Sequence, residues 1–118
     1  MAITINSQSK DFTEVEQYLM TLDSSITSLK DVEDNTSIPV SGYLTFTDEK
    51  QNGDSDDILS IITPDNEVFS CQSVTFKRSF DNITKIMHGK QFSIIKVSGT
   101  TKAGRPFINC ILDMKSVK

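Results

Sequence analysis

Several residue types that support catalysis are scarce in this sequence. Its 118 residues include one histidine, two cysteines, five glycines and no tryptophan. Cys71 and Cys110 are too few for a disulfide scaffold, so we expect two reduced, half-buried thiols. His88 and the cysteines show no zinc or nucleophile–base spacing, and there is no glycine-rich phosphate loop. The sequence therefore predicts no catalytic residue, no metal ligand and no cofactor, and we expect a protein that is not an enzyme.

Long apolar runs are also missing. No stretch approaches the roughly 18 residues of a membrane span, and the start "MAITINSQSKDF" lacks the basic end and apolar centre of a secretion signal. There is neither an internal repeat nor a low-complexity linker. We expect one cytosolic domain over residues 1–118, with no membrane partner.

The charge is divided unevenly along the chain. The net charge of -4 argues at first against a nucleic-acid partner. Residues 1–70, however, hold three lysines against fourteen acidic residues, a net charge of -11, while residues 71–118 hold nine basic against two acidic residues, a net charge of +7. This asymmetry predicts an anion-binding surface in the second half, unless the fold interleaves the two halves and cancels the field.

Hydrophobic periodicity predicts two helices. In "KDFTEVEQYLMTL" Asp11 and Glu14 fit a capping box, and a single apolar face is predicted to hold Phe12, Val15, Tyr18 or Leu19, and Leu22. The second helix is predicted to begin after Ser73 as N-cap and to end at His88-Gly89. Its apolar stripe comprises Phe76, Phe80, Ile83 and Met87.

Strand-like segments surround the second helix. Alternation over residues 38–47 predicts one half-buried strand with Pro39 at its beginning. Further strands are expected in "DILSIIT", "EVFSC", "QFSIIKVS" and "FINCILDM". Ile3 and Ile5 indicate a short edge strand, and "SLKDVEDN" a helical turn followed by a loop.

The expected fold class is mainly β. A helix between strands three and four of a five-stranded antiparallel sheet is the layout of the OB-fold barrel. The second helix would plug one end of the barrel with its apolar stripe. We therefore predict a single OB-fold-like domain, with residues 37–115 as the barrel and residues 1–36 as an N-terminal strand and helix extension.

An OB-fold binds single strands or oligosaccharides across its strands two and three, flanked by the loops between strands one and two and between strands four and five. Here the loop between strands four and five is "GTTKAGRP", which carries Lys102 and Arg105, and Lys96 lies one strand length earlier. Lys77 and Arg78 open the second helix, where the macrodipole favours anions, so they need another role. These five cations are the predicted contacts to the phosphates of single-stranded DNA.

Bases also need flat side chains on which to stack. Tyr43 is the first candidate, because Ser41 and Thr45 on the same strand face are polar. Phe107 is the second, because it follows the cationic loop. For Phe107, as for Phe69 and Phe92, a place in the core is the alternative.

The acidic stretch "DEKQNGDSDD" opposes this interpretation. It joins the first two strands of the predicted barrel at residues 48–57 and would repel phosphates. A calcium loop is an alternative, since Asp54 and Asp56 alternate, but no glutamate closes the pattern. A solvated hairpin loop fits the stretch better.

Two blocks of the sequence carry a family resemblance. These are "SVTF-R-F" at residues 73–80 and "SGTTKAGR-FI-C" at residues 98–110, within a likeness that extends over about residues 17–113. The chain resembles the single-stranded DNA-binding proteins of tailed phages of Gram-positive bacteria, of the lactococcal type. The resemblance implies an OB-like barrel that binds single-stranded DNA without sequence specificity, as a homodimer, in phage DNA replication or recombination. It also implies backbone contacts by Lys102 and Arg105, with Lys77, Arg78 and Lys96 nearby.

The expected function is thus sequence-nonspecific binding of single-stranded DNA in the host cytoplasm. Expected partners are the DNA, a second copy of the chain, and a phage recombinase or host replication proteins. A non-catalytic protein-interaction module that captures a host factor is the alternative, favoured by the acidic first half. An oligosaccharide binder ranks third, because it would not need nine cations.

Overall fold

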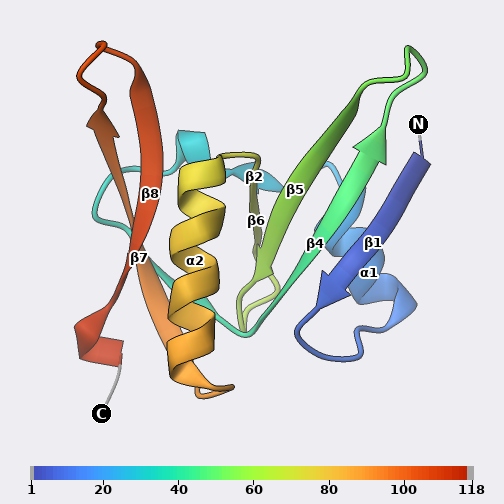
Figure 1. Cartoon of the computed structure of the whole chain (residues 1–118). Helices are drawn as coiled ribbons and strands as arrows, with labels where there is room; N and C mark the ends of the chain where they lie inside the picture. The colour runs from blue at the N-terminus through green and yellow to red at the C-terminus, as the bar shows by residue number, and fades with distance from the viewer. Residues whose placement is uncertain (1, 117–118) are drawn as a thin grey trace.

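A computed structural model describes residues 2–116 of the chain (Figure 1). Its elements, in chain order, are β1 (Ala2–Gln8), α1 (Glu14–Thr21), β2 (Thr27–Ser28), η1 (Leu29–Asp31), β3 (Ser37–Val40), β4 (Gly42–Glu49), β5 (Ser55–Ile62), β6 (Val68–Cys71), α2 (Val74–Met87), β7 (Phe92–Thr100), β8 (Pro106–Leu112) and η2 (Met114–Ser116). The strands form a five-stranded sheet, β1-β4-β5-β6-β2, and a three-stranded sheet, β3-β7-β8. The expected class, mainly β, is confirmed.

The single strand predicted over residues 38–47 is divided into β3 and β4, one in each sheet. The break lies at Ser41, whose amide donates to the carbonyl of Ile62 (2.9 Å). The buried alternation continues across the break, but Val40 packs in one core cluster and Leu44 in the other. Pro39 lies within β3, not at its beginning. It is tolerated there because β3 is an edge strand of its sheet.

The two sheets are not closed into the predicted barrel. The expected ladders β4–β5, β5–β6, β3–β7 and β7–β8 are all present and antiparallel. No ladder joins β6 to β8 within residues 2–116. The OB-fold barrel is therefore not confirmed.

The edge of β8 that would close the barrel is already occupied. The Ser73 hydroxyl at the start of α2 donates to the carbonyl of Ile108 (3.3 Å). The Cys110 amide donates to Oδ1 of its neighbour Asn109 (2.9 Å), and Pro106 has no amide to offer. Occupied polar groups and proline both discourage further strand pairing. The helix α2 packs against this edge instead.

The predicted stripe of α2 is confirmed. Phe76, Phe80 and Met87 are buried and Ile83 is partly buried, in a cluster that joins α2 to both sheets. Burial of each such side chain contributes roughly 1.5–3 kcal/mol. Ser73 is the N-cap, with its hydroxyl accepting from the Phe76 amide, as predicted. This helix therefore packs between the two sheets and helps to hold them together.

The prediction for α1 was wrong in register. Its capping box is formed by Thr13 and Glu16, two residues later than the expected Asp11 and Glu14. The helix therefore begins after Phe12, and its buried residue is Met20. Of the predicted apolar face, Phe12 is buried and Leu19, the alternative to Tyr18, packs against the core. Val15, Tyr18 and Leu22 are 69%, 51% and 53% exposed.

The first 36 residues contribute to the main sheet. The predicted edge strand is confirmed as β1, which pairs antiparallel with β4 and carries an irregularity between Ile5 and Ser7. The short β2 pairs in parallel with β6 at the other edge, and η1 is the predicted helical turn. The segment treated as an extension thus supplies both edges of the five-stranded sheet.

The acidic and basic halves of the chain contribute mostly to different sheets. The five-stranded sheet is built from residues 2–71, whereas β7, β8 and α2 come from residues 74–112 (Figure 1). Only β3 from the acidic half enters the second sheet. The two halves nevertheless meet where Asp34 bonds to Lys96 and Ser98, and where Lys77 bonds to the carbonyl of Asp57. Within residues 2–116 neither helix is long and apolar enough to cross a membrane.

Candidate functional site

The tip of the β7–β8 hairpin carries two exposed cations. The Thr101 amide donates to the carbonyl of Arg105 (2.9 Å), and the Gly104 amide donates to the carbonyl of Thr101 (2.8 Å). Gly104 has a φ of 84°, a left-handed conformation that favours glycine. Backbone hydrogen bonds close this turn, so the side chains of Lys102 and Arg105 are not needed to hold it. Both residues are exposed, and neither forms an ion pair with any residue in 2–116.

A hollow of about 530 Å³ lies at the base of this hairpin. It is lined from three parts of the fold, namely η1, the N-cap of α2, and strands β7 and β8. Its lining residues are Lys30, Ser73, Lys96, Ser98, Pro106, Phe107 and Ile108. The hollow thus joins an apolar wall to two lysines and two hydroxyls.

Phe107 forms the aromatic part of this wall. It is half-buried and lies opposite Gly99 in the β7–β8 ladder. A Cβ atom at Gly99 would lie 2.7 Å from Cζ of the Phe107 ring. The ring therefore covers the glycine and is held against the strand. The prediction that Phe107 stacks on a base stays a prediction.

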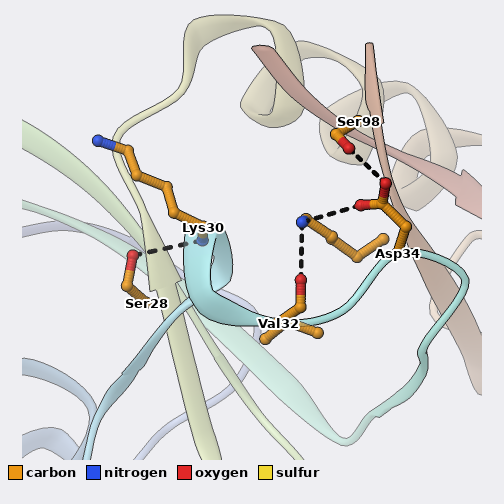
Figure 2. Close-up of polar contacts among 6 residues, drawn as sticks. Ser28, Lys30, Val32, Asp34 and Ser98 are labelled. Carbon is orange, nitrogen blue, oxygen red and sulfur yellow. Dashed lines mark hydrogen bonds and ion pairs between the residues drawn. The ribbon is translucent and has the colours of Figure 1, made fainter. Parts of the chain in front are cut away.

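Lys96 is buried, unlike the cations of the hairpin tip. It faces inward from β7 and is 4% exposed. Its Nζ donates to the carbonyl of Val32 (2.7 Å) and to Oδ1 of Asp34 (3.0 Å), and the Ser98 hydroxyl donates to Oδ2 of Asp34 (Figure 2). The bond from Ser98, followed by that from Lys96, holds the pKa of Asp34 below its usual value. The strand alternation turns Lys96 towards the core, so its ammonium is bonded within the fold. The prediction that Lys96 contacts a phosphate stays a prediction.

Lys77 and Arg78 also differ from each other. The half-buried Lys77 donates from Nζ to the carbonyl of Asp57 on β5 (2.9 Å), so it stabilises the packing of α2 on that strand. Arg78 is exposed. Neither residue lines the hollow beside Phe107.

Tyr43 lies in a different hollow from Phe107. Its ring meets Phe80 edge to face, with centroids 5.0 Å apart and an interplanar angle of 85°. It lines a separate hollow of about 210 Å³, together with Lys10, Lys90 and Phe92 among others. The two predicted stacking residues are thus not brought together, because β4 turns Tyr43 towards α2.

The acidic hairpin β4–β5 stands at the same end of the molecule as the basic hairpin β7–β8. Figure 1 shows the two tips apart from each other, with the beginning of α2 between them. Lys50 forms an ion pair with Asp56 (3.0 Å), which raises the pKa of Lys50. Asn52 and Asp54 bond to each other across the turn. Within residues 2–116 no three His, Cys, Asp or Glu side chains are grouped as metal ligands.

The two thiols are buried and free, as the sequence predicted in part. Burial raises the pKa of Cys71 to about 11. Burial, followed by the nearby Cys71, raises the pKa of Cys110 to about 12. Neither thiol resembles a reactive nucleophile, which needs a lowered pKa.

Two residues of the site were missed in the sequence. Lys30 lies in the acidic half, and nothing in its neighbourhood separates it from a solvated lysine. It reaches the hollow because β2 pairs with β6 and thereby places η1. Asp34 comes within bonding distance of Lys96, 62 residues away. Sequence periodicity carries no signal for either contact.

Comparisons with models of protein families, with curated proteins and with solved structures gave no match. The resemblance to phage single-stranded DNA-binding proteins therefore stays a prediction. The geometry of the site is the basis for the function proposed next.

Proposed function

We propose that this chain binds single-stranded DNA without sequence specificity and without catalysis, in phage DNA replication or recombination in the host cytoplasm. One observation carries the proposal: Lys102 and Arg105 stand exposed beside a hollow walled by Phe107. Single-strand binders combine cations that follow the backbone with aromatic rings that stack on bases. This part of the molecule offers both within one hairpin.

Each residue has a specific task in this proposal. Lys102 and Arg105 contact phosphates at the hairpin tip, and Lys30 contacts one from the opposite wall of the hollow. Phe107 stacks on a base, an interaction that contributes about 1–3 kcal/mol in such proteins. Arg78 is exposed at the start of α2 and extends the cationic surface, whereas Lys77 and Tyr43 have mainly structural contacts.

The order of strands supports an OB-like interpretation of the fold. Four of the ladders of an OB barrel are present, with α2 between the third and fourth strands of that scheme. We propose that the molecule is an opened variant of this fold. The β7–β8 hairpin is then the binding loop between strands four and five.

A protein contact is the second candidate function, and one observation favours it. Val15, Tyr18 and Leu22 form an exposed apolar stripe on α1, on the acidic half of the molecule. Exposed apolar patches often mark protein interfaces. We propose that this stripe serves the homodimer or binds a recombinase or host replication protein, separately from the DNA surface.

Binding of a fluorescent oligo-dT at increasing salt concentration tests the main proposal. Affinity should fall linearly on a log–log plot, with a slope of about -0.7 for each phosphate contact. Double-stranded DNA of equal length and a mixed-sequence single strand are the comparisons. Binding that does not respond to salt, or a preference for the duplex, would contradict the proposal. A protein captured from nuclease-treated lysate would favour the second candidate.

A further inference from the structure

Lys96 is a buried cation with incomplete hydrogen bonding. Its side chain is 6% exposed, and burial of a charge is costly unless it is paired. An ammonium group carries three N–H donors. Among residues 2–116 only two acceptors meet it, the carbonyl of Val32 and Oδ1 of Asp34. Because Lys96 also lines the hollow beside Phe107, its remaining capacity lies at the candidate site.

The partner carboxylate is far more accessible than the lysine. The Asp34 side chain is 49% exposed. One of its oxygens accepts from Lys96 and the other from the Ser98 hydroxyl (Figure 2). A phosphate group could bind in the same way, with one oxygen accepting from the ammonium and another from the hydroxyl. Asp34 therefore occupies an anion position whose donors come from β7.

The backbone near Asp34 is fixed separately from its side chain. The Asn35 amide donates to the carbonyl of Lys96 (2.7 Å), and the Lys96 amide donates to the carbonyl of Thr36 (3.1 Å). These bonds hold the loop on β7 whichever way the carboxylate points. Rotation of the Asp34 side chain into solvent would thus vacate the anion position without unfolding the loop.

We propose that Lys96 and Ser98 form a phosphate subsite that Asp34 covers in the free protein, and that a phosphodiester of bound single-stranded DNA displaces the Asp34 carboxylate. The proposal rests on the proposed function. One negative group replaces another, so the buried ammonium stays compensated. Lys30 lines the same hollow, but its side chain points away from the Asp34 contacts (Figure 2), so it is not part of this subsite.

The Asp34→Asn variant tests the subsite, and Glu33→Gln is its matched control. Asparagine keeps the shape, its oxygen can still accept from Lys96, and its amide nitrogen can donate to the Ser98 hydroxyl. It removes the competing charge, so oligo-dT should bind about tenfold more tightly. Glu33 is exposed and next in the chain, and its replacement makes the same change in net charge. Screening by salt should keep its effect within about twofold. Equal affinities of the two variants would overturn the proposal.

A double variant guards against misfolding. Asp34→Asn with Lys96→Met removes both charges of the pair together, so the buried position 96 is not left with an uncompensated charge. The double variant should bind oligo-dT at least about threefold more weakly than Asp34→Asn alone, because one phosphate contact is gone. Retention of the tenfold gain without Lys96 would show that the general charge, not the subsite, is responsible.

Measurements on the wild-type protein distinguish a phosphate of bound DNA from free inorganic phosphate as the ligand. The Asp34 carboxyl and Ser98 amide resonances should shift with oligo-dT and saturate together with binding, while inorganic phosphate leaves them in place. An equal response to inorganic phosphate would overturn the strand as the ligand. If the wild type binds oligo-dT but Asp34→Asn gains nothing, only this proposal fails. If no form binds at any salt concentration, the proposed function fails with it.

Discussion

Phe107 and Gly99 face each other across the β7–β8 ladder, and the ring covers the glycine. A Cβ at Gly99 would lie 2.7 Å from Cζ and 3.0 Å from Cε1 of the ring. A ring moves as a rigid unit, so the contact cannot be relieved by bending the end of the side chain. The absence of a side chain at position 99 therefore sets the position of the aromatic wall of the site.

We expect Gly99→Ala to destabilise the protein by about 1–3 kcal/mol, because overpacking displaces the ring. The affinity for oligo-dT should fall as well, since Phe107 leaves the hollow. Denaturant unfolding and DNA binding measure the two effects. In a Phe107→Leu background the shorter side chain should make the same glycine substitution less costly. Equal costs in the two backgrounds would contradict the contact.

The cations of the hairpin tip are expected to affect binding but not stability. Lys102→Ala with Arg105→Ala should make the salt slope less steep by about 1.4, the value for two lost contacts to a single strand. Its unfolding free energy should stay within about 0.5 kcal/mol of the wild type, as for most surface changes. Lys85→Ala with Lys115→Ala makes the same charge change on exposed residues outside the hairpin. An equal effect of both pairs would indicate only net charge.

Ser60 offers a test of the core. Its side chain is fully buried, and its hydroxyl has no hydrogen-bond partner among residues 2–116. A buried polar group without a partner is costly, so Ser60→Ala should raise the unfolding free energy by about 1 kcal/mol. Ser70→Ala, opposite in the β5–β6 ladder and half-buried, is the control. Loss of stability in Ser60→Ala would imply a partner for the hydroxyl, such as buried water.

The thiols should be slow to react in the folded protein. With the pKa of Cys71 near 11 and that of Cys110 near 12, almost no thiolate exists at pH 8. Both thiols should therefore react slowly with a disulfide reagent in the folded protein. Both should react fast once denaturant unfolds the chain. A fast phase before unfolding would show that one thiol is exposed.

The lowered pKa of Asp34 predicts how the stability of the folded protein changes with pH. Its pKa lies below the usual 3.8, because Ser98 and then Lys96 bond to the charged form. The resulting stabilisation is complete above that usual pKa and is lost as the pH falls through the folded value. Wild type should thus exceed Asp34→Asn in stability at pH 7, and the difference should shrink below pH 3.8. Glu33→Gln should show no such dependence in the same acid titration.

Much of the local structure was evident in the sequence because its causes are local. The α2 stripe repeats every three to four residues and Ser73 precedes it, so the helix and its buried face were predicted correctly. The hairpin that bears Lys102 and Arg105 was predicted from its glycines and the flanking apolar runs. The start of α1 was predicted wrongly because two possible capping boxes overlap in the sequence, Asp11 with Glu14 and Thr13 with Glu16. Only the second box is present, and the helix that follows it buries Met20.

The sequence by itself determined where most strands lie along the chain, the stripe of α2 and the uneven division of charge between the two halves, because each depends on residues close together in the chain. Only the tertiary structure decided that Ser41 divides one strand between two sheets, and that the β8 edge stays apart from β6. It also turned Lys96 inward to Asp34 and brought Lys30 to the hollow of Phe107. These contacts join residues that are distant in sequence, and packing, not periodicity, selects among them.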